Sequence, residues 1–174
     1  MLILALCLIL ALWLIFQLHV PKFHVDDATM TEFTHSPTNN TLYYNMAVCM
    51  TFRNPNKRLG IYYNKVELNA AYQGVRFASN DLTAFYLGHK SEKNVCTVFK
   101  GQQVMVFGNG HKEESYDGER KDQVYKIDMK LRLKIKFKVL GMKSPKLTPK
   151  FDCDLKVPLS SKRKFERTKC DFSL

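Results

Sequence analysis

The chain has 174 residues, and its 27 Lys and Arg against 16 Asp and Glu give a formal net charge of +11. A hydrophobic fraction of 45%, with 12 Phe and 8 Tyr, excludes a disordered chain and suffices for one packed domain. The positive balance predicts contact with an anionic surface, such as lipid headgroups, acidic polysaccharides or nucleic acid, without choosing among them.

Residues 1–20 contain no Asp, Glu, Lys or Arg and begin with the apolar run MLILALCLILALWLIF. A helix over this stretch would be about 30 Å long, which matches a bilayer core, and Pro21 would end it. A cleaved signal peptide is the main alternative, but no basic residue precedes the run and no small-residue cleavage pattern follows it. We therefore expect residues 1–20 to be an uncleaved transmembrane anchor, with the folded domain on the non-cytosolic side.

Beyond Pro21, apolar and polar residues alternate with period two, which is typical of strands buried on one side. The predicted strands include residues 42–53, 61–72, 124–140 and 150–159. About seven short strands separated by turn residues predict an all-β fold, an antiparallel β-sandwich of the immunoglobulin or fibronectin-III type. We assign 21–41 to a juxtamembrane segment with the first strand, and 42–174 to the sandwich domain.

Three connecting stretches are interpreted from their turn residues. Gln73 and Gly74 predict a tight turn. The stretch 94–108 reads as two short strands about Gly101, and the polar stretch 109–123 reads as a loop.

The segment KIDMKLRLKIKFKV, residues 126–139, places six cations and one acid on one face of a predicted strand. This basic face is interpreted as the solvated side of the strand, with a diffuse attraction for lipid headgroups or acidic polysaccharides. The residues proposed for that contact are Lys130, Arg132, Lys134 and Lys136. Nucleic acid is not an expected partner, because Tyr125 and Phe137 lie on the opposite, apolar face and leave no stacking platform beside the cations.

No motif in the sequence predicts catalysis, a cofactor or a metal. The five His are scattered, the five Cys form no C-x-x-C pair, and no G-x-S-x-G, H-E-x-x-H or Walker sequence occurs. We expect a protein that is not an enzyme.

The cysteines and one sequon bear on the compartment. Cys153 and Cys170 bracket the last strand and the tail, and their pairing in an oxidising compartment would contribute about 3 kcal/mol; the alternative is two free thiols. Cys49 and Cys96 are expected to be free, and Cys7 lies in the apolar run. Asn39-Asn40-Thr41 is an N-glycosylation sequon, with Asn39 as acceptor.

Four blocks carry a family resemblance across nearly the whole chain. They are RNPNKRLGIYYNKVELNAAYQGVRF (53–77), FYLGHK (85–90), CDLKVPL (153–159) and the terminal F-x-x-T-K-C (165–170). The chain resembles the plant harpin-induced-like family, related to the non-race-specific disease resistance protein, whose domain is the late embryogenesis abundant group-two, or water-stress-and-hypersensitive-response, domain.

The resemblance implies a plasma-membrane protein with one span, an outward β-sandwich, protein partners and a role in defence and stress responses, without catalysis. A stress protectant or an anionic-lipid-binding domain without a signalling role is the alternative. The family usually has a cytosolic tail before the span, whereas this sequence starts within the apolar run. Asn64 and Leu87 replace the customary Asp and Gln of the blocks.

The most specific block predicts a turn that shapes the sandwich or, alternatively, displays a binding site. Its residues are Asn54, Pro55, Asn56, Lys57, Arg58, Gly60, Tyr62 and Tyr63. The Asn side chains can cap local backbone groups, and Lys57 and Arg58 would project from the tip. Tyr62 and Tyr63 have opposite parity, so only one of them can be buried.

Overall fold

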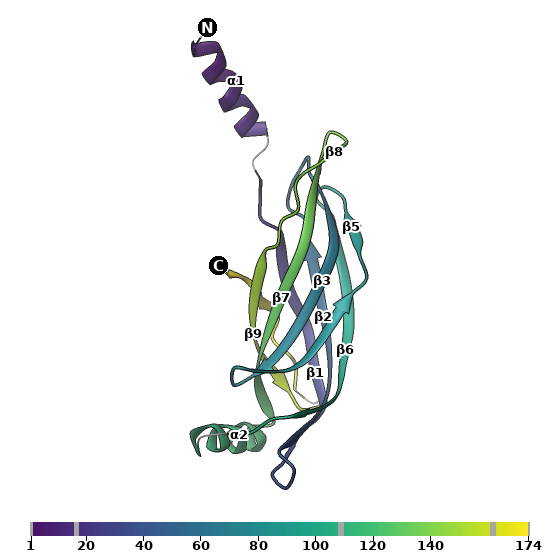
Figure 1. Ribbon diagram of the computed structural model, residues 1–174, viewed down its shortest axis with the longest axis vertical. Helices are drawn as coiled ribbons and strands as arrows, with labels where there is room; N and C mark the ends of the chain where they lie inside the picture. The colour runs from purple at the N-terminus through teal and green to yellow at the C-terminus, as the bar shows by residue number, and fades with distance from the viewer. Residues whose placement is uncertain (1, 16–17, 108–109, 161–162, 174) are drawn as a thin grey trace.

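The computed structural model describes residues 2–15, 18–107, 110–160 and 163–173. It has an elongated body of strands with a helix at each end (Figure 1). Helix α1 (Leu2–Ile15) projects beyond one end, where β5 and β8 also lie, and helix α2 (Gly110–Asp122) lies at the other. We call these the α1 end and the α2 end of the body.

The strands form two antiparallel sheets that face each other. The smaller has the order β10-β1-β2-β6, and the larger has the order β11-β9-β7-β3-β4, with β5 paired to β3 and β8 paired to β7. The smaller sheet contains β1 (Lys22–Ser36), β2 (Thr41–Arg53), β6 (Glu92–Val104) and β10 (Thr168–Lys169). The larger contains β3 (Gly60–Tyr72), β4 (Val75–Leu82), β5 (Phe85–Leu87), β7 (Val124–Val139), β8 (Met142–Lys143), β9 (Lys150–Pro158) and β11 (Asp171–Ser173).

The core lies between the sheets and takes alternate residues of β2, β7 and β9, because successive side chains point to opposite faces. Toward the α1 end, Phe23, Phe52 and Tyr63 pack edge to face with ring centroids 5.2 to 6.4 Å apart. Toward the α2 end, Phe33 packs against Tyr72 at 5.1 Å and Tyr125 at 4.5 Å. Burying such a ring contributes about 1.5–3 kcal/mol, so the alternation is what commits these segments to strands.

The all-β prediction is confirmed as a fold of antiparallel sheets, and the four alternating segments form β2, β3, β7 and β9 within one residue of their predicted ends. The turn at Gln73 and Gly74 is also confirmed, with φ angles of 50° and 81° that suit a two-residue hairpin. The immunoglobulin or fibronectin-III type stays a prediction.

Strand β6 corrects the prediction of two short strands about Gly101. It runs unbroken from Glu92 to Val104 and pairs along its whole length with β2. Gly101 lies opposite Tyr44, and a Cβ atom at Gly101 would come within 2.9 Å of the Tyr44 hydroxyl oxygen. The glycine therefore permits a close cross-strand approach within a strand, where the sequence indicated a turn.

Helix α2 corrects the prediction of a loop over 109–123, of which residue 109 lies outside the described residues. The helix buries one residue, Tyr116, so it has no apolar stripe that would reveal it. Tertiary contacts hold it instead: the backbone N–H of His35 donates to the Tyr116 hydroxyl at 2.9 Å, and the Tyr72 hydroxyl donates to Glu119 at 3.0 Å.

Two disulfides cross-link the body, one between neighbouring strands and one between a strand and the tail. The predicted Cys153–Cys170 disulfide is present and links β9 to the tail, where the backbone N–H of Cys170 also donates to the Phe23 carbonyl at 3.0 Å. The prediction that Cys49 and Cys96 are free is wrong, because they face each other in the β2–β6 register and form the second disulfide. They are separated by 47 residues and by three other strands, so their pairing depends on a register that periodicity does not give.

Helix α1 has 14 residues, about 21 Å of length. The anchor predicted over 1–20 also includes residues 1, 16 and 17, which lie outside the described residues. Within the described ranges, no helix has both the length and the apolar character needed to cross a membrane. The side chains of residues 2–9 are exposed, and the core cluster takes none of them.

Candidate functional site

The basic face predicted from the sequence lies on the outer side of the larger sheet. Lys130, Arg132 and Lys134 are exposed and Lys136 is half-buried, while the alternating Leu131, Leu133 and Ile135 are buried in the core. The strand places its cations outward because a one-residue shift would put all of them into the core.

The neighbouring strands give the cations different surroundings along β7. Arg132 lies opposite Glu67 of β3 and Lys150 of β9, and Lys130 lies opposite Asn69 and Asp152. Toward the α1 end, Lys134 lies opposite Lys65, and Lys136 lies opposite Tyr62. The sequence pointed to β7 alone, since the residues that adjoin it on β3 and β9 depend on strand order.

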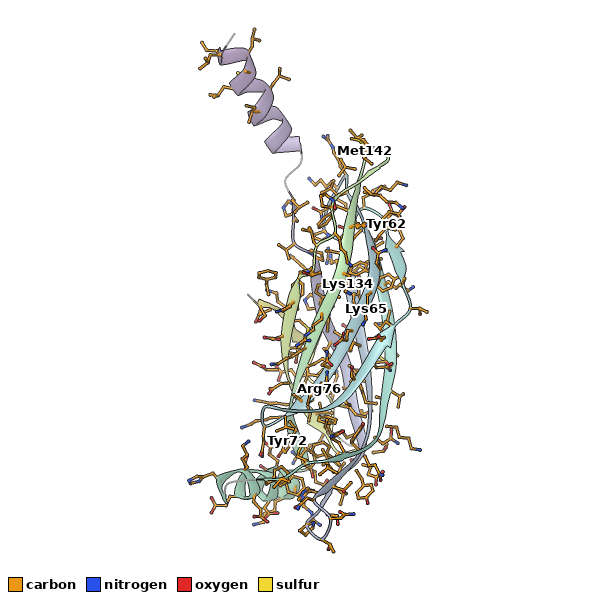
Figure 2. All side chains as sticks on the ribbon, viewed as in Figure 1. Tyr62, Lys65, Tyr72, Arg76, Lys134 and Met142 are labelled. Carbon is orange, nitrogen blue, oxygen red and sulfur yellow. A yellow bond between two sulfur atoms is a disulfide. The ribbon has the colours of Figure 1, made fainter. Side chains whose placement is uncertain are left out.

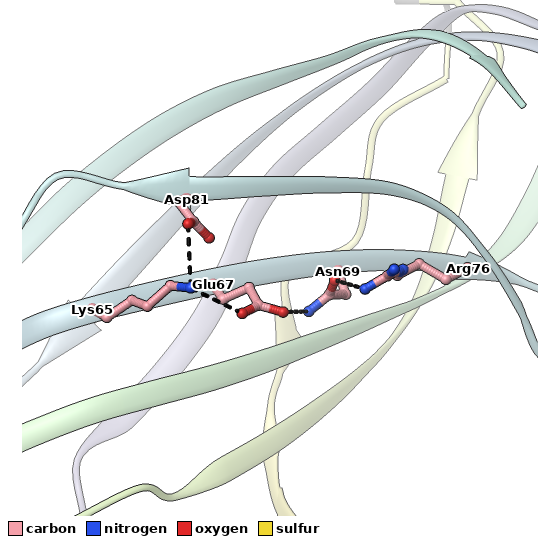
Figure 3. A network of polar contacts seen from close by, with 5 residues as sticks. All are labelled: Lys65, Glu67, Asn69, Arg76 and Asp81. Atoms are coloured by element: carbon pink, nitrogen blue, oxygen red, sulfur yellow. Dashed lines mark hydrogen bonds and ion pairs between the residues drawn. The ribbon is translucent and has the colours of Figure 1, made fainter.

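A chain of polar contacts runs along β3 and β4 beside the basic face (Figure 3). Lys65 Nζ lies 3.3 Å from Glu67 and 3.4 Å from Asp81. Asn69 donates to Glu67 at 2.8 Å and accepts from Arg76 at 3.2 Å.

These contacts change the charge that is free on the face. The Asn69 amide, followed by Lys65 and Arg132, holds the pKa of Glu67 below its usual value, so Glu67 is ionised. Hydrogen bonds to Glu67 and Asp81 raise the pKa of Lys65. The positive charge of Lys65 is thus balanced by two carboxylates. None of the four β7 cations forms an ion pair with a carboxylate in the described part of the chain.

Two shallow hollows lie along the basic face, with volumes of about 240 Å³ and 190 Å³. Arg132 and Lys150 line both of them. The larger adds Lys65, Lys134, Thr148 and the ionised Glu67, and the smaller adds Lys130 and Asp152, so each depression combines several donors with one carboxylate. Such a set suits a carboxylate or a phosphate, which accept from several donors at once.

An acidic pair interrupts the basic face between Lys130 and Lys126 of β7, the second of which lies opposite Lys156 of β9. Asp128 of β7 lies directly opposite Asp154 of β9. Burial and the nearby charge of Asp154 raise the pKa of Asp128, even though Lys130 opposes the shift. An anion would therefore find its most favourable position from Arg132 toward the α1 end.

The turn of the most specific sequence block is a buried polar hub. Asn54 is fully buried and donates from its amide to the carbonyls of Leu59 at 2.7 Å and Gly88 at 2.8 Å. Its side-chain oxygen accepts from the backbone and the amide of Asn56 at 3.1 and 2.9 Å. Asn54 thus joins the loop after β2 to the loop after β5.

Asn56 extends this hub to the segment that follows α1. Its side-chain oxygen accepts from the backbone N–H of His19 at 2.7 Å, and its amide donates to the His19 carbonyl at 2.8 Å. The paired hydrogen bonds fix the chain just before β1. Lys57 and Arg58 are exposed, as predicted for the tip.

The two tyrosines after this turn point to opposite faces of the larger sheet, as adjacent residues of a strand must. Tyr63 is buried in the core, and Tyr62 is half-buried on the outer face. The ring of Tyr86 lies across Gly60, where a Cβ atom would collide with it. Tyr62 and Tyr86 place two aromatic rings beside the cations of β7, which the sequence of β7 alone could not indicate.

The remaining predicted positions lie apart from the basic face. Asn39 is exposed in the β1–β2 turn near the α2 end, and its glycosylation stays a prediction. Of the blocks' two departures, Asn64 is exposed and Leu87 is buried. In the described residues, no three His, Cys, Asp or Glu side chains gather to hold a metal ion.

Comparison with known proteins decides the family. Residues 50–153 match the family of late embryogenesis abundant proteins. Three proteins of Arabidopsis thaliana are similar over most of the chain. NDR1/HIN1-like protein 3 is 46% identical over 93% of this chain and 71% of its own length, protein 10 is 41% identical over 94% and 74%, and protein 2 is 42% identical over 95% and 70%. This chain belongs to the NDR1/HIN1-like proteins of the late embryogenesis abundant family.

The resemblance read from the four sequence blocks is therefore confirmed. Solved structures show only loose similarity to this NDR1/HIN1-like chain. A putative late embryogenesis abundant protein, solved in solution, has 14% identity and a TM-score of 0.34 over 85% of this chain and 78% of its own. A crystal structure of a protein from Archaeoglobus fulgidus has 9% identity and a TM-score of 0.35, and the match covers 78% of this chain and 98% of that protein.

Proposed function

We propose that this NDR1/HIN1-like chain is a non-enzymatic protein of plant defence and stress responses, attached to the plasma membrane by one span with its folded domain outside the cell. The domain would act through contacts with partner proteins or between membrane and wall. The observation that supports this is the joining of an entirely apolar helix, α1, to a domain whose outer face carries unpaired cations.

The basic face would supply the contact with acidic wall polymers. These polymers carry carboxylates at regular intervals, and the two hollows around Arg132 and Lys150 offer neighbouring positions for them. The attraction is electrostatic and lies on an exposed surface, so it should weaken as salt is added. No chemical step is required for such a contact.

Topology is the first test of the proposal. In membranes from native tissue, we expect the chain to resist alkaline extraction and to shift in mass on endoglycosidase treatment. An Asn39→Gln variant should lose that shift and keep its membrane association, because Asn39 is exposed and distant from α1. A chain that stays unglycosylated and is protected from protease inside sealed vesicles would argue against an outward domain.

Binding to an acidic polymer is the second test. The full chain in detergent should bind polygalacturonate, and the triple variant Lys130→Ser, Arg132→Ser, Lys134→Ser should bind about 3- to 150-fold more weakly, since each exposed ion contact contributes about 0.2–1 kcal/mol. The control Lys100→Ser, Arg163→Ser, Lys164→Ser removes the same charges from exposed sites elsewhere. If the two variants lose the same affinity for polygalacturonate, binding depends only on net charge, and the basic face of β7 is not the binding site.

A protectant or anionic-lipid-binding role without signalling is the second candidate. It is favoured by the concentration of cations toward the α1 end, nearest to any membrane that holds α1. Plants lacking the gene separate the two proposals. Impaired survival of water loss with normal immune output would favour the protectant, and the reverse would favour the defence role.

A further inference from the structure

The hairpin between β7 and β8 carries an exposed apolar tip at the α1 end (Figures 1 and 2). Leu140 is 86% exposed and Met142 is 71% exposed. Leu140 and Gly141 form the turn with φ angles of 46° and 85°. Positive φ favours Gly, Asn or Asp, so a leucine here combines backbone strain with exposure of an apolar side chain. Because the Leu140 side chain is 86% exposed, packing against the described part of the chain does not compensate for the backbone strain or for the exposed apolar surface.

The tip is presented on a fixed arm. The Ser144 backbone N–H donates to the Phe137 carbonyl at 2.8 Å, and its hydroxyl accepts from the Phe137 N–H at 2.9 Å. Leu147 and Ile135 exchange two backbone hydrogen bonds of 2.9 Å. The chain after the turn thus stays paired with β7, and the exposed Leu140 does not result from a loose loop.

Cations and tyrosines surround the tip. Lys138 lies opposite Lys143 in the hairpin register, and Lys146 is exposed on the returning arm. Lys143 Nζ lies 4.7 Å from the ring centre of Tyr62, and Lys138 Nζ lies 5.9 Å from that of Tyr86. The two tyrosine rings are 4.5 Å apart. An apolar tip with lysines and tyrosines behind it is the composition of segments that sit at a membrane surface.

The position of the hairpin relative to α1 identifies the occupant. Both lie at the same end of the body, and residues 18–21 between α1 and β1 are clamped at His19 by Asn56 (Figure 1). A bilayer that received α1 would therefore lie close to the β7–β8 tip. The lysines around the tip match the negatively charged phosphates that lipid headgroups carry.

We propose that the β7–β8 hairpin, with Leu140 and Met142 at its tip, inserts into the headgroup surface of the membrane that holds α1. This second contact would fix the tilt of the sandwich on the membrane. The inference rests on the proposed attachment through α1, and the experiment separates the two.

The single tryptophan of the chain makes the test direct, because Trp13 lies in the apolar run. The full chain is reconstituted into vesicles of phosphatidylcholine and phosphatidylserine, with or without brominated acyl chains that quench nearby tryptophan. Trp13 in the wild type reports on α1. Leu140→Trp, and separately Met142→Trp, in a Trp13→Phe background report on the hairpin. Val104→Trp in the same background is the control, because Val104 is 64% exposed at the end of β6 that pairs with Thr41.

We expect the hairpin probes to shift to the blue and to lose more than half of their emission in brominated vesicles, with smaller changes when phosphatidylserine is omitted. The Val104→Trp probe should be unaffected by bromination. Quenching of Trp13 without quenching of either hairpin probe would overturn the inference and leave the attachment intact. Unquenched Trp13 would instead contradict the attachment. A blue shift that grows with protein concentration and ignores bromination would reassign the tip to a second copy of the chain.

Discussion

At the scale of single residues, Asn54 shows how a polar side chain can be part of a core. Its amide donates to the Leu59 carbonyl and its side-chain oxygen accepts from the Asn56 backbone N–H, so Asn54→Ala would leave both groups without that partner, while the Gly88 carbonyl keeps the Ser91 hydroxyl as a donor. Each such loss costs about 1–3 kcal/mol, and we expect the free energy of unfolding to fall by about 3 kcal/mol in urea titrations. Asn64→Ala, on an exposed side chain, is the control and should change it by less than about 0.5 kcal/mol. If Asn54→Ala and Asn64→Ala lowered the free energy of unfolding equally, the hydrogen bonds of Asn54 would not stabilise the fold.

Asp128 gives a prediction with a defined pH dependence. Its pKa is raised in the folded chain, first by burial and then by Asp154, so the folded state disfavours the ionised form. When folding raises the pKa of a carboxyl group, the folded state loses stability as the pH rises from the unfolded pKa through the folded pKa. Asp128→Asn should therefore be more stable than the wild type at neutral pH, and the difference should vanish near about pH 3.

The measurement is the melting temperature of both chains at several pH values, with Asp117→Asn on the exposed surface of α2 as the control. The idea fails if Asp128→Asn is the less stable chain at neutral pH. It also fails if the difference between the two chains does not change with pH.

At the scale of elements, β6 depends on the close approach of Gly101 to Tyr44. Gly101→Ala places a Cβ atom 2.9 Å from the Tyr44 hydroxyl oxygen, and the ring cannot easily retreat because it packs on Phe77 at 4.9 Å. Such overpacking costs about 1–3 kcal/mol, which thermal or urea unfolding would detect. Adding Tyr44→Phe removes the colliding atom and should recover part of the loss.

Gly118→Ala is the matched control for Gly101→Ala. Gly118 lies in α2, where an added Cβ atom meets nothing within 4 Å. The same substitution should there stabilise the chain by up to about 1 kcal/mol, because alanine favours a helix over glycine. A strictly additive double variant of Gly101→Ala and Tyr44→Phe would show that the two side chains are not in conflict.

These elements also show which features periodicity can predict. Strand β7 was predictable because seven apolar residues alternate with its charges, and only one register buries them all. Strand β6 was divided at Gly101 because a glycine in sequence signals a turn, and the opposing Tyr44 ring is visible only after pairing. Helix α2 was missed because Tyr116 is its one buried side chain. In α2, the placement of Glu113 in the first turn and Arg120 and Lys121 in the last agrees with the helix dipole and was the available signal.

The candidate site follows the same division. The cations of β7 were identified because one strand carries them all. Lys150 and Glu67 were not identified, and Tyr62 was named only as part of its turn, because these residues adjoin β7 only through the order of strands in the larger sheet. Leu140 was read as the end of a strand, and its exposure on a strained turn depends on the backbone geometry. Family resemblance fixed the domain and left these surface arrangements open.

At the scale of the whole molecule, the two disulfides bear on the compartment of the folded domain. Cys153–Cys170 spans 17 residues and Cys49–Cys96 spans 47. In the chain-entropy model they contribute about 3 and 4 kcal/mol, a large share of the 5–15 kcal/mol that is usual for a domain. A domain kept in a reducing compartment would lose both contributions, and we therefore predict an oxidising native location.

Counting thiols in native membranes tests that conclusion. Membranes are dissolved in denaturant and treated with a maleimide of known mass before and after reduction. We expect one label before reduction, on Cys7, and five after it, because the other four cysteines are paired. The variant Cys49→Ser, Cys96→Ser should give one and then three labels, which assigns the pairs. Five labels before reduction would place the domain in a reducing compartment, and the outward topology would then have to be abandoned together with the glycan at Asn39.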